Sequence, residues 1–148
     1  MEYLGNKDIL KQHKTAFLCS QKVPAEIVLK SYDWAKQQRE LGNCIVCGNH
    51  SQIEKDVVEI LLRGKQALII VIARSMKKRW EAEIQKAIDE NRLLIISPFK
   101  KSVKRVSRQT AEIRNQEILN ISEKITLAYA TKNGQLAKLS ENQQYETI

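Results

Sequence analysis

The sequence predicts an α/β fold, a Rossmann-like three-layer sandwich with a mostly parallel sheet of about five strands and helices on both faces. Two observations lead to this prediction. Short apolar runs alternate about five times with segments of helical periodicity, which is typical of a parallel sheet. The strongest run, residues 67–73, is apolar on both faces, as a strand covered on both sides must be. The connections between the strands are expected to be right-handed.

The size and composition predict one globular domain, and the net charge favours an anionic partner. The 148 residues, of which 43% are hydrophobic and 28% charged, suit a single domain over residues 1–148. The net charge of +8 favours a polyanion such as nucleic acid without requiring one.

The targeting and cysteine patterns predict a cytoplasmic location. No apolar run reaches membrane-spanning length, and the first residues lack the basic and apolar regions of a signal peptide. The three cysteines, an odd number placed in apolar strand patterns, indicate free buried thiols in a reducing compartment. No association with membranes is expected.

The first elements of the chain are a lead-in segment, a strand and a helix. The polar lead-in over residues 1–13 is expected to be a short helix or an extended arm, and residues 15–20 predict the first strand. Pro24 suits the first position of a helix, which is expected to end near Gly42.

The stretch that follows is the centre of the predicted fold. Residues 44–47 predict a buried strand, and Gly48 ends it because glycine permits the φ values of a sharp turn. Asn49 and Ser51 are candidate N-caps for a helix over residues 52–63. A strand, a turn and a helix N-terminus together leave free backbone N–H groups, which make a generic phosphate site.

The second half of the chain continues the alternation and ends in a polar tail. Its patterns predict a strand at 67–73, a helix at 80–91, a strand at 93–97, a long helix at 101–121 and a strand at 124–130. A turn at residues 132–134 precedes a short helix near 136–139, and residues 140–148 are expected to be a flexible, solvated tail.

Candidate ligand-binding residues lie at the carboxyl ends of the predicted strands, because open α/β sheets bind ligands there, near the point where the strand order reverses. They are Ser20, Gly48, Asn49, His50, Ser51 and Arg74. Two further candidates stand on the long helix. Arg114 either binds phosphate or pairs with Glu117, and Asn115 either caps the backbone or hydrogen-bonds a base or ribose.

A run of basic residues forms a second candidate surface. Spacings of three and four positions recur among the basic residues of this run, so they are expected to lie on one side of the long helix. They are Lys101, Lys104, Arg105 and Arg108. No acidic residue interrupts residues 97–111. The run is either a strip that binds nucleic acid or a solvated helix face, and the sequence leaves both alternatives open.

The spacing of Cys44, Cys47 and His50 invites a metal-site interpretation, which the strand geometry disfavours. Side chains three apart in a strand point to opposite faces, whereas one tetrahedral ion needs its ligands to converge. We therefore predict no metal and no cofactor, and the sequence offers no catalytic residue.

Several of these motifs resemble those of the DprA/Smf family of DNA-processing proteins. Residues 47–54 are similar to the family's Ser-Gly-x-Ala-x-Gly-Ile-Asp motif, in which Gly48 matches the first glycine and Glu54 stands in place of the aspartate. His50 and Gln52 replace a small alanine and the second glycine. The Arg-Asn pair at 114–115 and the segment at 128–136 resemble the family's last helix, strand and turn.

The resemblance implies a Rossmann-like domain that binds single-stranded DNA through a basic crevice, acts as a homodimer and helps to load a recombinase. The wider superfamily includes LOG-type phosphoribohydrolases, whose Pro-Gly-Gly-x-Gly-Thr stretch is represented here by Gly134 alone. We therefore expect a DNA-binding protein without hydrolase activity. The alternatives are a nucleotide or nucleotide-derivative binder, either a sensor or a LOG-related enzyme, and a purely structural dimer.

Overall fold

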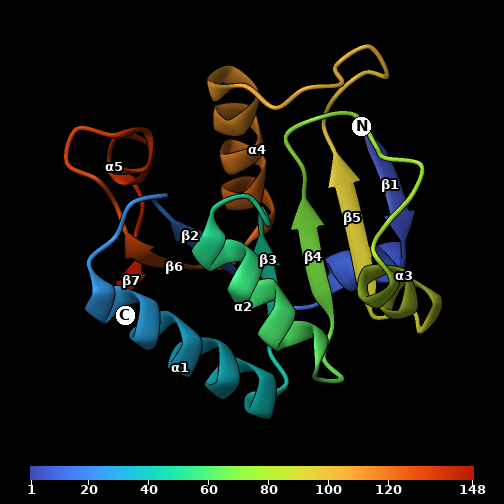
Figure 1. Cartoon of the computed structure of the whole chain (residues 1–148), viewed down its shortest axis with the longest axis horizontal. Coiled ribbons are helices and arrows are strands. Elements are labelled where there is room, and N and C mark those ends of the chain that lie inside the picture. Colours follow the sequence, from blue (N-terminus) through green and yellow to red (C-terminus); the bar gives the residue numbers. More distant parts are fainter.

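The computed structural model describes residues 1–148 and shows the predicted three-layer sandwich (Figure 1). One seven-stranded sheet has the order β1-β5-β4-β3-β2-β6-β7. Its strands are β1 (Glu2–Gly5), β2 (Lys14–Cys19), β3 (Cys44–Cys47), β4 (Leu68–Val71), β5 (Leu93–Ser97), β6 (Lys124–Tyr129) and β7 (Glu146–Thr147). The helices are the 3-10 helix η1 (Lys7–Lys11), α1 (Ala25–Leu41), α2 (Gln52–Leu62), α3 (Ala82–Asp89), α4 (Arg108–Ile121) and α5 (Gln135–Ser140).

The five central strands, β2 to β6, are all parallel, which confirms the predicted fold class. Helices α1, α2 and α3 pack on one face through a core that includes Ile27, Ile53 and Ile84. Helices η1, α4 and α5 cover the other face. Every residue of β4 is buried, as its uninterrupted apolar run predicted.

The strand order reverses at β2. From β2 the chain adds β3, β4 and β5 on one side, and it then returns through α4 to place β6 on the other side. Helix α4 therefore lies on the face opposite to α1, α2 and α3. The crevice between the carboxyl ends of β2 and β6 is the place where this kind of sheet binds ligands.

Two short edge strands extend the predicted sheet. The lead-in segment contains both a strand and a helix: β1 pairs antiparallel with β5, and η1 follows it. The segment expected to be a solvated tail contributes β7, whose two exposed residues pair with β6.

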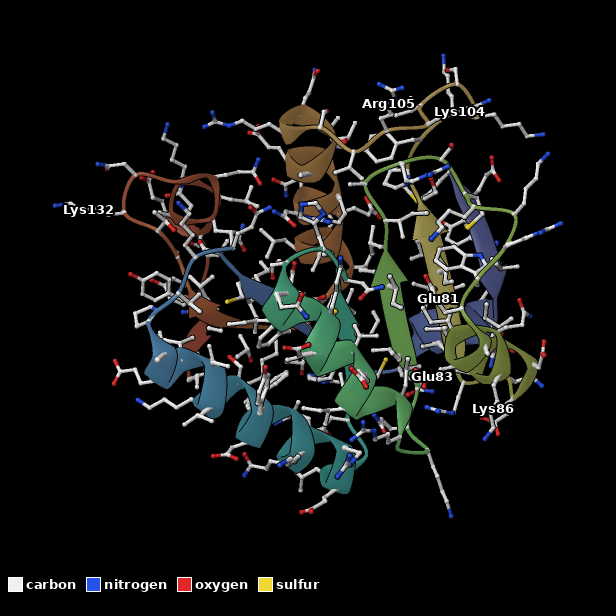
Figure 2. The ribbon with its side chains drawn as sticks, viewed as in Figure 1. Glu81, Glu83, Lys86, Lys104, Arg105 and Lys132 are labelled. Carbon is white, nitrogen blue, oxygen red and sulfur yellow. The ribbon has the colours of Figure 1, made fainter.

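The long helix is shorter than predicted, because it begins at Arg108 instead of Lys101. Ser107 has an extended backbone and forms a capping box with Thr110, and these contacts fix the helix start. Lys101, Lys104 and Arg105 therefore lie on a loop, and their predicted helical face is wrong. Figure 2 shows Lys104 and Arg105 projecting from this loop. None of the helices combines the length and apolar character needed to cross a membrane.

Candidate functional site

A pocket of about 660 Å³ opens at the point where the strand order reverses. Ser20 at the end of β2, His50 and Ser51 after β3, and Arg108 and Arg114 on α4 contribute to its walls. The pocket therefore brings together predicted site residues that lie far apart in the sequence. Asn115 lines it as well, together with Lys22, Thr131 and Gln135.

Arg114 is a buried cation with unused hydrogen-bond donors. Its side chain is only 3% exposed, and its single hydrogen bond within the protein runs from Nε to Asn115 Oδ1 (3.1 Å). The predicted alternative, an ion pair with Glu117, does not form. Burial lowers the pKa of Arg114, and the charges of Glu54 and Cys47 partly oppose this shift. The two terminal nitrogens therefore supply donors to the pocket without a protein acceptor.

A chain of side-chain contacts fixes the orientation of Arg114. Asn115 accepts from Arg114 and donates from Nδ2 to Gln135 Oε1 (3.0 Å). Gln135, the first residue of α5, in turn donates to the backbone carbonyl of Arg108 (3.2 Å). The amide of Asn115 is thus engaged in holding Arg114, and α5 is tied to the start of α4.

Gly48 matters for space and not for a turn. The sequence predicted that Gly48 provides the φ values of a sharp turn, but the left-handed residue is Asn49, with φ of 50°. A Cβ at Gly48 would lie 2.9 Å from Nε and Cζ of Arg114. The glycine is needed because the guanidinium lies directly against the end of β3.

The N-terminus of α2 is not the open phosphate site that the sequence predicted. The Glu54 carboxylate accepts from the Ser51 N–H (2.8 Å), while the Glu54 N–H donates to Ser51 Oγ (3.2 Å). This capping box places the protein's own anion at the helix N-terminus. An incoming phosphate would meet that negative charge, and Arg114 is the buried cation of the pocket whose hydrogen-bond donors are unused.

Ser20 and His50 complete the wall opposite α4. The Thr131 N–H donates to Ser20 Oγ (2.9 Å), which joins the ends of β2 and β6. His50 Nε2 lies 3.1 Å from Nε2 of Gln21. Burial, and secondarily the charge of Arg114, lowers the pKa of His50, so this ring is neutral at pH 7. It offers one donor or acceptor and no charge.

The remaining predicted residues lie outside the pocket. Asn49 provides the left-handed turn, and Arg74 Nε donates to the Ser75 carbonyl (3.1 Å) after β4. Lys101, Lys104 and Arg105 are exposed on the loop before α4, where they form an outer basic rim. Figure 2 shows Lys132 on the loop after β6, on the other side of α4 from this rim and close to α5.

Glu54, Lys22 and Gln135 are pocket residues that the sequence analysis did not assign to the site. Glu54 carried a signal, because it occupies the acidic position of the motif at residues 47–54. Gln135 and Lys22 carried none, since their places in the pocket depend on how elements distant in the sequence pack together.

The cysteines lie in separate environments. Cys44 packs in the core beneath α4, and Cys47 packs in the core beneath α2, as the alternation of strand side chains predicted. Cys19 lines the pocket, but burial, with a smaller effect from Glu54, raises the pKa of its thiol to about 12. It therefore stays protonated at neutral pH and is a poor nucleophile.

Comparison with known proteins places this geometry on a known fold. No family model and no curated protein sequence matches the chain. The DprA structure from Helicobacter pylori, described for its single-stranded DNA binding mode, aligns with a TM-score of 0.75 and 17% identity, over 98% of this chain and 69% of its own. DprA from Streptococcus pneumoniae aligns with a TM-score of 0.76 and 21% identity, over 99% of this chain and 53% of its own.

A more distant likeness joins the chain to the molybdenum cofactor carrier protein of Chlamydomonas reinhardtii, at a TM-score of 0.51 and 6% identity. The chain spans about half the length of the Streptococcus protein, so the comparison concerns one part of that molecule. At these identities the likeness establishes the architecture. The chain has the Rossmann-like fold of the DprA proteins, as the resemblance in its motifs predicted.

Proposed function

We propose that this protein is a DprA-like DNA-processing protein that binds single-stranded DNA in the pocket between β2, β6 and α4. A phosphate of the strand lies on Arg114, and the neighbouring phosphates follow Arg108 and the basic rim. The DprA fold supports this proposal, as do the net charge of +8 and the three basic residues in the pocket lining, Lys22, Arg108 and Arg114.

The observation that carries the proposal is the state of Arg114. A buried charge is costly unless it is paired, and this guanidinium has one neutral hydrogen-bond acceptor and no salt bridge. An anionic ligand would supply the missing partner, and its charge-assisted bonds would be stronger than neutral ones. Folding therefore leaves a buried cation that feels the charge of Glu54 but forms no hydrogen bond or salt bridge with any anion of the protein.

Fluorescence anisotropy with a labelled single-stranded oligonucleotide tests the proposal, with a duplex of the same sequence as the control. We expect affinity to fall steeply with salt, because phosphate contacts release counterions. Arg114→Ala should weaken binding by about tenfold or more, and Arg114→Lys by less, since a point charge replaces the guanidinium fork. Lys86→Ala on α3, at the opposite edge of the sheet, is the matched control and should bind normally.

Binding that ignores salt, or an Arg114→Ala protein that folds and binds like the wild type, would contradict the proposal. A thermal melt of each variant separates loss of binding from loss of folding. The proposal also includes a homodimer, a recombinase partner and a cytoplasmic location. Light scattering checks the first, and co-precipitation with a purified recombinase checks the second.

A second candidate function is the binding of a free nucleotide or nucleotide derivative. The volume of the pocket favours it, because about 660 Å³ lies within the range of small-molecule sites. A nucleotide that binds the native state would raise the melting temperature of the protein. No shift across a panel of mononucleotides would exclude this candidate, and a shift without any strand binding would replace the first proposal.

A further inference from the structure

The pocket contains a buried acceptor as well as a buried donor. Glu54 lines it beside Arg114 and is likewise only 3% exposed. One carboxylate oxygen, Oε1, accepts from the Ser51 N–H, and the other has no hydrogen-bond partner in the protein. Although the charges of Glu54 and Arg114 influence each other, the salt bridges of the structure do not include this pair.

An unpaired anion beside an unpaired cation restricts what can fill the pocket. A phosphate suits Arg114 but is repelled by Glu54, so the group that reaches Glu54 must donate a hydrogen bond. Within a DNA strand the phosphodiesters and the deoxyriboses carry no such donors. The donors of the strand are the amino and imino groups of its bases.

We propose that Glu54 reads the base of one nucleotide inserted into this pocket and selects a base with adjacent hydrogen-bond donors, of which guanine is the best match. This inference rests on the proposed function, because it assumes that a strand enters the pocket. The phosphate of the inserted nucleotide lies on Arg114, and its base edge lies on the carboxylate of Glu54.

Guanine is favoured by the order of groups along its Watson–Crick edge. Its N1–H and N2 amino group are neighbours, so both can donate to one carboxylate. Thymine has a single imino donor between two carbonyl oxygens, and a carboxylate repels those oxygens. Adenine and cytosine offer an amino group next to a ring nitrogen that is an acceptor. Their expected affinity for the carboxylate therefore lies between those of guanine and thymine.

The burial of Glu54 makes this discrimination effective. An exposed carboxylate that meets the wrong base edge exchanges the lost contact for water, whereas a buried one is left without a partner. The capping box also fixes the position of the carboxylate, because Oε1 is held by the backbone at residue 51. The reading group is therefore largely buried and held in position before the strand arrives.

The test uses a labelled thymine oligonucleotide with one central position changed, measured by anisotropy at low salt. We expect the strand with central guanine to bind about tenfold tighter than the all-thymine strand. Central hypoxanthine lacks the N2 amino group and should lose about fivefold relative to guanine. Central 7-deazaguanine is the matched control, because it alters the other edge of the ring and should bind like guanine.

Glu54→Gln assigns the discrimination to this side chain. Glutamine can still accept from the residue 51 N–H in the capping box, so the fold is retained, and a thermal melt checks this. The amide presents a donor as well as an acceptor, so the ratio of guanine to hypoxanthine affinity should fall towards one. A ratio that is unchanged in this variant would overturn the assignment.

The outcomes separate this inference from the proposed function. Salt-dependent binding with equal affinity for all central bases would overturn the inference and leave strand binding intact. If no strand binds at all, the proposed function fails, and melts with dGMP, dIMP and dTMP then decide the inference. A melting temperature raised most by dGMP would sustain base reading by Glu54, and equal shifts or no shifts would refute it.

Discussion

Gly48 and Arg114 show how one residue can act by leaving room for another. The guanidinium lies where a side chain at position 48 would be, at the carboxyl end of β3. Because Gly48 does not have a left-handed backbone, an alanine there would not strain the φ angle. Its Cβ would instead clash with a neighbouring side chain. The neighbour is the end of a flexible side chain, so the substitution moves Arg114 more than it disturbs the fold.

Gly48→Ala should therefore weaken binding of single-stranded DNA by about tenfold while lowering the free energy of unfolding by only about 1 kcal/mol. Anisotropy and urea unfolding on the same protein measure the two effects. Gly64→Ala is the matched control, because a Cβ there also meets flexible side chains, those of Gln66 and Arg39, at the far edge of the sheet. Equal loss of binding in both variants would contradict the role given to Gly48.

A second residue pair anchors the amino end of β2. Lys14 is buried, and its Nζ donates to Glu123 Oε1 (2.9 Å) and to the carbonyls of Leu10 and Gln12. Desolvation alone would raise the pKa of Glu123, but hydrogen bonds from the Lys14 side chain and backbone, with the Lys14 charge, lower it overall. The ionised carboxylate is therefore the form that the folded protein favours.

Because the folded-state pKa of Glu123 lies below its ordinary value of 4.5, its stabilisation is complete above that pH and is lost as the pH falls through the folded value. Glu123→Gln should lower the free energy of unfolding by about 1 kcal/mol at pH 7, a value reduced for the partial exposure of the pair. Thermal melts over a pH series should show wild type and variant converging in acid. A gap that stays constant below pH 4 would contradict this linkage.

At the scale of elements, the start of α4 determines where the cations of the site lie. Ser107 caps the helix, so Arg108 falls in its first turn and Arg114 falls on the face turned towards β3. The residues before the cap form a loop, which projects the basic rim away from the body of the protein. A helix that began at Lys101 would have placed those side chains along one side of the helix and not on a projecting loop.

Ser107→Ala removes the acceptor for the Thr110 N–H, and we expect it to lower the free energy of unfolding by about 1 kcal/mol. Binding should weaken severalfold as well, because fraying of the first turn displaces Arg108 and the Gln135 contact to its carbonyl. Ser122→Ala at the other end of α4 is the control for loss of a helix-end serine. Loss of stability without loss of binding would show that the first turn does not shape the site.

At the scale of the whole molecule, charge is distributed unevenly between the two edges of the sheet. Lys104, Arg105 and Lys132 lie at the carboxyl edge, whereas acidic and basic residues mix around α3 (Figure 2). The amino edge carries both signs of charge: the basic residues Arg63, Lys65, Lys86 and Arg92 and the acidic residues Glu59, Glu83 and Glu90. A polyanion should therefore approach at the carboxyl edge, where the pocket opens.

Replacing Lys101, Lys104 and Arg105 together by alanine should lower the slope of log affinity against log salt by about two for single-stranded DNA, since each lost phosphate contact contributes about 0.7. Replacing Arg63, Lys65 and Lys86 together by alanine removes the same charge from the amino edge and should leave the slope nearly unchanged. Equal changes in the two triple variants would mean that net charge, and not the rim, sets the affinity.

The sequence was sufficient to predict the architecture, because the spacing and the type of apolar residues indicate directly which segments are buried. Residues 67–73 could hardly be anything but a central strand, and the five parallel strands follow from such runs. The pocket was harder to predict. Helical spacing within residues 101–107 was misleading, since local capping by Ser107 outweighed it. The strand, turn and helix start around Gly48 indicated a phosphate at α2, but Glu54 occupies that helix end itself.

The spacing of residues along the chain could not show which distant side chains line the same pocket. Ser20, Arg114 and Gln135 meet through the packing of α4 and α5 on the sheet, and no local pattern encodes that meeting. Gly48 was noticed for a turn that Asn49 makes instead. The glycine was significant, but the residue that requires it is Arg114, on a helix much later in the chain.

That shared space also constrains how the sequence can change over time. A mutation that adds a side chain at position 48 removes the reason to keep arginine at 114, and loss of Arg114 in turn frees position 48 for larger residues. The two positions should therefore vary together among descendants of a common ancestor, although one ends a strand and the other lies inside a helix. Lineages that abandon the pocket's ligand should lose the pair in either order, and lineages that keep the ligand should retain both.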